Sequence, residues 1–517
     1  MRMALAGLVM RRRTLLGALS LLALLLAAGP GTVAGQGARP FEITVAFGTD
    51  ATTLDPHMST QISDTDLYYN IFDGLLRRDR NLKLVPALAV SWRNVNPTTW
   101  EFKLRENVQF HNGERFDANA VKFTLDRILD PAQKVFVASQ WNTVREVQVV
   151  DPHLVRIVTK EPDPLLPART ASYGREILPP QYFQQVGAQA FARRPVGTGA
   201  WMLKDWKKDE HIVLEANKKW WGGAPKIDKV TIRPIPESAA RVAALLAGEV
   251  DVVASVPPAQ VDTITRSGKA SVKSAPQATM IVFMANVRKA PLGDKRFRQA
   301  ISLAIDRPSL VQNLYRGYAK LPNGPIADTD FSYDPATPPL AYDPEKAKAL
   351  LRDVGYKGEL VELDTPEGAF PQDREMTEAV AGMLQKVGIN AKVNVIELAV
   401  RVQKIRTQAF NGLYNAAPYS TLLDPDGVLW RLLAPGSSHR YWENAEFDKL
   451  MAEGRGTVDQ GRRLALYRKA IAIMMDEMPW IVMTQAVYVW GHTSRVDYTP
   501  RGDERIIFSE IVPANTR

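Results

Sequence analysis

The stretch PVGTGAWMLKDWKKDEHIVLEANKKWWGGAPKIDKVTIRPIPESAARVAALLAGEVDVV, residues 195–253, decides the fold. Two runs rich in Trp, Val, Ile and Leu, residues 201–206 and 211–217, flank the charged tip Lys207-Lys-Asp-Glu210. Strand-like runs on either side of a short polar turn are typical of a β-hairpin. Residues 229–234 alternate again, so we expect a third strand there.

A helix and another strand complete this unit. Residues 239–247 follow the polar pair Glu237-Ser238, and their apolar side chains fall on one face of a helix that Gly248 ends. Residues 250–254 then resume a strand-like pattern. A helix that feeds a short apolar strand through Gly-Glu is typical of an α/β domain.

The stretch opens with Val196-Gly-Thr-Gly199. Because glycine adopts positive φ angles at little cost, we interpret these four residues as a tight reversal that depends on such angles.

Other segments predict strands and helices on the same grounds. Residues 148–160 alternate and predict one strand, while residues 272–275 and 279–285 predict two. Residues 345–354 and 375–387 predict helices, each ended by a glycine. These units favour a second α/β lobe downstream of the first.

The composition is that of a globular protein and excludes several classes. The chain has 517 residues, of which 45% are hydrophobic and 23% charged, with a net charge of +9. At roughly 150 residues per domain, this length allows more than one domain. The chain contains no cysteine, which excludes disulfides, thiolate metal sites, cysteine nucleophiles and a lipid-modified cysteine. Basic residues are scattered along the chain, so we expect no nucleic-acid partner.

The first 34 residues predict an export signal. Arg11-Arg-Arg13 precedes an apolar run over residues 15–28 and then small residues, the layout of a cleavable secretory signal. Arg12-Arg13-Thr-Leu-Leu16 also resembles a twin-arginine export motif. We expect cleavage at Ala34 or nearby, because the apolar run is shorter than the roughly 20 residues needed to span a membrane.

Motifs for catalysis or metal binding are missing from the sequence. The six histidines show no H-E-x-x-H spacing, and there is no G-x-S-x-G elbow or phosphate-binding glycine loop. His111, in the turn His111-Asn-Gly113, is interpreted as a turn residue and not as a metal ligand. We therefore expect no cofactor, no metal site and no catalytic residues. A secreted hydrolase, whose acid–base pairs leave no trace in sequence, is the alternative from another class.

Several motifs occur together and in order. They include Pro86-x-Leu-Ala-x-Ser-Trp92, Asn217-x-x-Trp-Trp-Gly-Gly-x-Pro225, the Glu-Ser-Ala-Ala-Arg and Leu-Leu-Ala-Gly-Glu-Val-Asp-Val segments of residues 237–252, and Tyr342-Asp-Pro-Glu-Lys-Ala-Lys348. In this combination, over roughly residues 41–490, the chain resembles the peptide/nickel family of extracytoplasmic solute-binding proteins, solute-binding family 5, which serve ATP-driven (ABC) importers.

The resemblance implies an α/β, periplasmic-binding-protein-like two-lobe fold with hinge strands and an inserted third α+β subdomain. The expected boundaries are 38–70, 195–283 and 480–517 for lobe I, 71–194 for the inserted subdomain and 284–479 for lobe II.

The resemblance also implies a ligand cleft bordered by particular family-like segments. We predict ligand contacts from eight side chains chosen by their position in those segments: Thr60, Gln61, Tyr173, Phe283, Asn286, Tyr419, Thr421 and Asp424.

The ligand follows less directly from the resemblance. Family members that bind short peptides pair the free ammonium group with a carboxylate in a segment that matches residues 417–426 here. Residues 420–423 contain no acid, and Asp424 matches the trailing Asp-Pro of the motif. A buried ammonium group without a counter-charge is costly, which weakens the interpretation as a carrier of free-amine peptides. A peptide or peptide-like solute is expected, and an opine-like solute, a sugar-like solute or a chelated metal remain alternatives.

Partners and location follow from the same resemblance. We expect a monomeric periplasmic protein without a lipid anchor that passes its ligand to ABC permease subunits in the cytoplasmic membrane.

Overall fold

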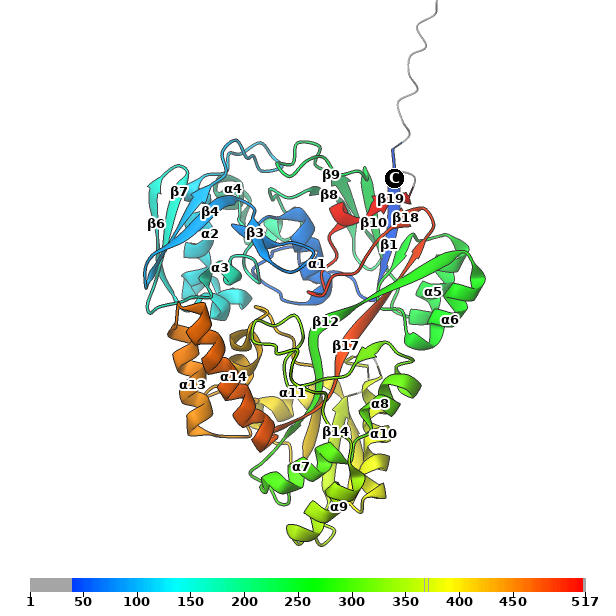
Figure 1. The fold of residues 1–517 in the computed structure, drawn as a ribbon. Helices are drawn as coiled ribbons and strands as arrows, with labels where there is room; N and C mark the ends of the chain where they lie inside the picture. Colours follow the sequence, from blue (N-terminus) through cyan, green and yellow to red (C-terminus); the bar gives the residue numbers. More distant parts are fainter. Residues whose placement is uncertain (1–39, 367, 371, 515–517) are drawn as a thin grey trace, which may run out of the picture. The chain divides into compact units, whose positions relative to one another are not determined.

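A large mixed sheet organises the chain (Figure 1). The structure is a computed structural model that describes residues 40–514 except 367 and 371. The predicted export signal and its cleavage site lie outside the described residues. Among these residues, eleven strands form one sheet in the order β15-β14-β16-β12-β17-β11-β1-β10-β9-β8, with β13 paired to β17.

This sheet has two halves, one that contains β1 and one that contains β14. Two long strands, β12 (Ala270–Ala285) and β17 (Trp480–Thr493), take part in both halves. They pair antiparallel along nearly their whole length. One end of β17 pairs with β11 (Val252–Val253), whereas the other end of β12 pairs with β16 (Leu413–Ala416). The prediction of two strands over 272–275 and 279–285 was wrong in detail, because one strand runs through both with a register break between Pro276 and Met280.

Residues 195–253 contain the predicted hairpin, third strand and helix, and their strands lie at the other end of the sheet. β8 (Trp201–Lys207) and β9 (His211–Ala216) make the hairpin, β10 (Lys229–Pro234) pairs with β9, and β1 (Glu42–Phe47) lies parallel to β10. Helix α5 (Ser238–Ala247) ends at Gly248, whose φ of 75° is the left-handed conformation of a helix C-cap. Helix α6 (Val261–Ser267) lies between β11 and β12.

The glycines of the Val196–Gly199 turn serve a different purpose from the one predicted. Neither Gly197 nor Gly199 has a positive φ angle. Instead, a Cβ on Gly197 would lie 2.1 Å from the carbonyl oxygen of Ile71, and one on Gly199 would lie 2.5 Å from that of Asn70. These carbonyls belong to the last turn of α1 (Ile62–Ile71), so the glycines allow close approach of two backbones.

A separate four-stranded antiparallel sheet, in the order β4-β5-β7-β6, occupies the segment predicted as an insertion. Residues 148–160 form a hairpin and not one strand, since Pro152-His153 makes a turn between β6 and β7. The elements of this segment are β2 (Leu76–Arg78), β3 (Leu84–Pro86), β4 (Ala89–Asn96), β5 (Thr99–Leu104), α2 (Ala118–Leu129), β6 (Val144–Asp151), β7 (Leu154–Thr159), α3 (Leu166–Arg169) and α4 (Pro180–Phe191).

The remaining half of the sheet is covered by helices on both faces. Along β12, Ile281, Phe283 and Ala285 pack into one hydrophobic cluster, and the alternate residues pack into another. This alternation is the two-residue period of a strand. The first cluster holds α7 (Lys295–Leu303), α9 (Pro344–Asp353) and α10 (Asp373–Lys386), and the second holds α13 (Ala445–Gly456) and α14 (Gln460–Glu477). Strands β14 (Val361–Pro366) and β15 (Ala391–Ile396) complete this end of the sheet, and α11 (Leu398–Thr407) follows β15.

The predicted α/β class is therefore confirmed, and separate hydrophobic clusters fill the four-stranded segment and the two halves of the large sheet. The domain boundaries given above stay predictions.

His111 joins the four-stranded segment to the turn at Gly197. Its Nδ1 accepts a hydrogen bond from the Gly197 N–H (3.2 Å), and its Nε2–H donates to the Gly199 carbonyl (3.0 Å). Burial lowers the pKa of His111 to about 4, so the ring is neutral at pH 7 and this tautomer satisfies both contacts. The interpretation of His111 as a turn residue fits these contacts.

We expect His111→Ala to lower the free energy of unfolding by about 2 kcal/mol at pH 7, because it leaves the Gly197 N–H without a partner and the Gly199 carbonyl with Asn217 alone. The folded-state pKa of His111 lies below the value of about 6.5 expected for the unfolded chain, so its stabilising contribution is present above pH 6.5 and is lost as the pH falls through about 4. Urea unfolding at pH 7 and pH 5 measures both effects. His211→Ala, at the hairpin tip, should cost less than about 1 kcal/mol, and an equal loss in both variants would contradict the assignment.

Candidate ligand-binding site

A cavity of about 440 Å³ lies between residues of the first part of the chain, Thr60 and the inserted segment, and residues from the end of β12 onward. Thr60, Phe136, Ser139, Gln140 and Tyr173 form one side. The other side is lined by Met284, Arg401, Ala416, Ala417, Pro418, Tyr419, Thr421, Arg431, Leu432 and His439. Its volume is within the roughly 300–1,000 Å³ typical of small-molecule sites.

The Tyr419 side of the cavity is held by the register break in β12. The Met280 N–H donates to the Pro418 carbonyl (3.1 Å), and the Ser420 N–H donates to the Ala278 carbonyl (3.0 Å). The Tyr419 hydroxyl donates to the Asp503 carbonyl (3.2 Å). At the break, backbone groups of β12 that do not pair with β17 bond to the loop that carries Tyr419 and hold it in place.

A buried arginine stands behind the aromatic lining. The Arg505 Nη2 donates to the Tyr173 hydroxyl (3.0 Å), and its guanidinium carbon lies 5.3 Å from the ring centre of Tyr173 and 5.9 Å from that of Tyr419. Because the Tyr173 oxygen accepts from Arg505, its own proton remains available to a ligand acceptor.

The structure brings four of the eight predicted residues to this cavity: Thr60, Tyr173, Tyr419 and Thr421. Their role in binding stays a prediction. Gln61 is exposed at the N-terminus of α1 and is not part of the lining.

The other three predicted residues have structural contacts. Phe283 is fully buried in the cluster beneath α7. Asn286 donates to the Phe410 carbonyl (2.7 Å) and accepts from the Arg288 N–H (3.1 Å). Asp424 is 3% exposed and contacts Arg463 through both oxygens, at 2.7 and 2.6 Å. These three residues are not part of the cavity lining.

Three cationic or ring-nitrogen side chains in the lining were not predicted: Arg401, Arg431 and His439. Arg401 follows the apolar run Leu398-Ala-Val400, a pattern that does not indicate the helix α11 that carries it. His439 is one of the six histidines that show no metal-binding spacing. No local signal marks these residues, because they meet through contacts between distant segments.

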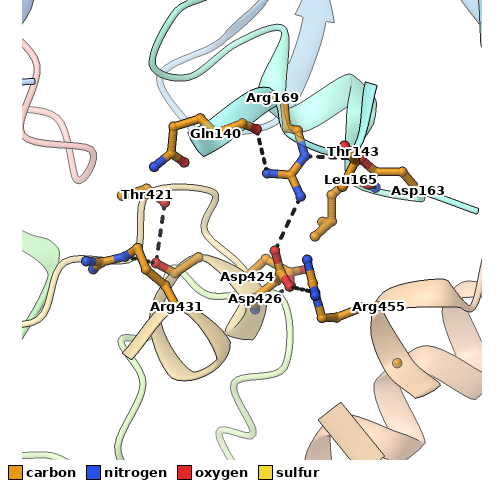
Figure 2. A network of polar contacts seen from close by, with 12 residues as sticks. Gln140, Thr143, Asp163, Leu165, Arg169, Thr421, Asp424, Asp426, Arg431 and Arg455 are labelled. Atoms are coloured by element: carbon orange, nitrogen blue, oxygen red, sulfur yellow. Dashed lines mark hydrogen bonds and ion pairs between the residues drawn. The ribbon is translucent and has the colours of Figure 1, made fainter. Parts of the chain in front are cut away.

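A polar network joins the two sides beside the cavity (Figure 2). Arg169, at the end of α3, donates to Asp163 (3.1 Å) and to the Gln140 carbonyl (3.0 Å), and it pairs with Asp426 (3.4 Å). Asp426 also pairs with Arg455 on α13. The Ser172 hydroxyl donates to the Thr421 carbonyl (2.8 Å) close by. Although burial opposes the charge of Arg169, Asp163 and Asp426 raise its pKa, so the guanidinium stays charged.

A larger hollow of about 970 Å³ lies elsewhere, between the β8–β9 hairpin, Tyr182 and residues 192–196. Its lining includes no residue that follows β12. Movement of one side of the large sheet against the other would not enclose it, so we place the candidate site in the smaller cavity.

Neither a membrane-spanning helix nor a metal-binding group was found in the described part of the chain. Its helices are too short or too polar to cross a bilayer, and no three His, Asp or Glu side chains are grouped as metal ligands.

Comparison with known proteins identifies the family. The model for bacterial extracellular solute-binding proteins, family 5 (middle), matches residues 83–439, well over half of the chain. The chain belongs to family 5 of the bacterial extracellular solute-binding proteins. This family serves ABC importers, and the two-lobe fold expected from the sequence is confirmed.

Relatives of this solute-binding protein match along most of its length. The glutathione-binding protein GsiB of Escherichia coli (strain K12) is 26% identical over 468 residues, which cover 88% of this chain and 91% of GsiB. The periplasmic binding protein DppA from Helicobacter pylori, in complex with the peptide STSA, is 24% identical with a TM-score of 0.79 and covers 92% of this chain and 99% of that one. NikA from Brucella suis, in complex with Fe(III)-EDTA, is 23% identical with a TM-score of 0.82, over 91% and 99% of the two chains.

Asp426→Asn should weaken the contact between the two sides of the cavity, because it leaves Arg455 without its counter-charge and Arg169 with Asp163 alone. Breaking one member of a buried pair costs about 3–5 kcal/mol, and since Arg169 keeps Asp163 we expect a loss of about 1–3 kcal/mol in the free energy of unfolding. Small-angle scattering of the ligand-free variant should show a larger radius of gyration.

Glu443→Gln, which removes an exposed pair with Arg288, is the matched control. It should change stability by less than about 1 kcal/mol and leave the radius unchanged. Equal radii for Asp426→Asn and the unmodified protein would show that this network does not hold the two sides together.

Proposed function

We propose that this solute-binding protein captures a peptide or peptide-like small solute outside the cytoplasmic membrane and delivers it to the permease of an ABC importer. Closure of the two lobes over the solute would exclude water and present a surface to the permease.

The observation that carries this proposal is the cavity between the inserted segment and the second half of the sheet. It is large enough for a short peptide, and it offers two tyrosine rings beside backbone groups of the Pro418–Thr421 loop. Tyrosine presents an apolar face together with a polar tip, which suits peptide-like solutes. The name of the relative GsiB, which binds glutathione, agrees with this class of ligand.

The remaining parts of the proposal concern the protein's export, its location, its oligomeric state and its lack of catalytic activity. We propose that the protein is exported by a signal cleaved at Ala34 or nearby, acts as a periplasmic monomer without a lipid anchor, and performs no catalysis. The sequence pattern of residues 1–34 supports export by a cleaved signal, and the missing cysteine supports the lack of a lipid anchor.

The test is native mass spectrometry of the protein exported from its full sequence. We expect a complex heavier than the mature chain that releases a peptide or peptide-like mass on denaturation. Absence of any bound solute, together with no affinity for a library of short peptides after refolding, would refute the carrier function. Turnover of chromogenic esters by the purified protein would favour the hydrolase alternative instead.

Tyr419→Ala should weaken the affinity for the solute that co-purifies by about tenfold or more, because a buried ring and its stacking surface are lost. Titration calorimetry on refolded, ligand-free protein measures the change. Tyr342→Ala removes a tyrosine that is 48% exposed and outside the cavity lining, and it should bind like the unmodified protein. A wild-type affinity for Tyr419→Ala would exclude this ring from the binding site.

A further inference from the structure

The charges in the cavity lining all have one sign. Arg401 and Arg431 lie on the side that follows β12, together with His439. Within the described residues, no Asp or Glu side chain belongs to the lining. The cavity therefore carries two guanidinium groups without a counter-charge of its own.

Arg431 is held in place by backbone carbonyls. Its Nε donates to the Gly427 carbonyl (2.9 Å) and its Nη2 to the Tyr419 carbonyl (2.9 Å). Neither acceptor is charged, and in the part of the chain that the structure describes no carboxylate pairs with Arg431. Arg431 is exposed to solvent, and its guanidinium group stays charged, as guanidinium groups do in proteins. The fixed geometry leaves the Nη1 donors for a ligand.

Arg401 has even fewer partners. Among the described residues its side chain forms no hydrogen bond or ion pair, and its Nε is buried without an acceptor. Burial lowers the pKa of this group. Removing a cation from water without a counter-ion costs free energy, which an anionic ligand would return.

His439 adds a neutral donor to the same lining as these cations. Its Nδ1 lies 3.0 Å from the Tyr414 hydroxyl. Burial raises the pKa of Tyr414, so that hydroxyl keeps its proton and donates it to the imidazole nitrogen, a better acceptor than the Met284 sulfur at 2.9 Å. The proton of the neutral ring is then on Nε2. Burial and the charges of Arg431 and Arg401, which line the same cavity, lower the pKa of His439 to about 4.

A partner for a ligand ammonium group is missing from the same wall. Residues 420–423 contain no acid, and Asp424 is occupied by Arg463 through both of its oxygens. Four neighbouring buried acids are likewise engaged: Asp330 with Ser420, Asp426 with Arg455, Asp503 with Arg501 and Glu504 with the Thr279 hydroxyl. A cationic group in the cavity would therefore face two arginines and no carboxylate.

We infer that Arg401, Arg431 and the Nε2–H of His439 form an anion-binding subsite that selects an acidic peptide-like solute with at least two carboxylates. This inference rests on the proposed function and specifies its substrate class. Each guanidinium takes one carboxylate through charge-assisted hydrogen bonds, which are shorter and stronger than neutral ones. The subsite discriminates against a free ammonium group, because a like charge without a counter-ion is repelled there.

The experiment compares three probes of equal length on refolded, ligand-free protein: N-acetyl-Glu-Ala-Glu, the neutral N-acetyl-Gln-Ala-Gln amide, and Lys-Ala-Lys amide. Titration calorimetry should show at least hundredfold tighter binding of the acidic probe than of the neutral one, and no detectable binding of the lysine probe. Equal or tighter binding of the neutral or lysine probe would overturn the inference and leave the proposed function standing. Failure of all three probes, with no solute co-purifying from the exported protein, would overturn both.

Two variants test the residues themselves. Arg401→Gln and Arg431→Gln should each weaken binding of the acidic probe at least tenfold and change binding of the neutral probe by less than threefold. Arg406→Gln removes the same charge from an exposed position of the same helix, α11, and should bind both probes like the unmodified protein. Equal losses for Arg401→Gln and Arg406→Gln would show a long-range charge effect and not a subsite.

Two further measurements separate a binding role from a structural one. Because Arg401 has no partner, Arg401→Gln should leave the thermal midpoint of the ligand-free protein unchanged or raise it, whereas a structural arginine would lower it. In ¹⁵N-histidine NMR spectra, the pKa of His439 should rise from about 4 when the acidic probe binds, since the bound carboxylates offset the charges of Arg401 and Arg431. An unchanged His439 pKa in the complex would exclude the ring from the subsite.

Discussion

The antiparallel pair of β12 and β17 is the constraint on which the rest of this structure depends. Both strands take part in both halves of the eleven-stranded sheet, so a single ladder connects the β1 end with the β14 end. The register break between Pro276 and Met280 interrupts that ladder. The backbone groups freed there bond to Pro418 and Ser420, so the same irregularity that joins the halves also fixes the loop that carries Tyr419.

The two faces of the second half of the sheet follow from the strand period. Ile281 and Phe283 pack beneath α7 and α10, while Met280, Val282 and Met284 pack toward α13 and α14. Met284 also reaches the cavity lining. Burial of both faces makes this part of the sheet a rigid support, and the polar groups of the site are carried by the loops and short helices at its edge.

The arginines of the network between the two sides have carboxylate partners, whereas the arginines of the cavity lining have none among the described residues. At the contact, the buried Arg169 is paired with Asp163 and Asp426, and within the side that follows β12 the buried Arg463 is paired with Asp424. In the cavity, the half-buried Arg401 and the exposed Arg431 have no carboxylate partner among the described residues. Paired buried charges hold a geometry, whereas unpaired cations leave donors that a ligand of opposite charge can occupy.

Much of this protein could be read from its sequence. The hairpin of residues 201–216, the helix ended by Gly248 and the α/β class depend on local periodicity and turn chemistry, and the family depends on motifs whose order is visible in the chain. The site was predicted in part: Thr60, Tyr173, Tyr419 and Thr421 reach the cavity, whereas Phe283, Asn286 and Asp424 are used in the core and in structural bonds. The tertiary structure alone decided that Gly197 and Gly199 serve close approach, that Asp424 belongs to Arg463, and that Arg401, Arg431 and His439 share one wall. The physical reason is that periodicity reports which face of an element is buried, while the partner of a polar side chain depends on distant segments that meet after folding.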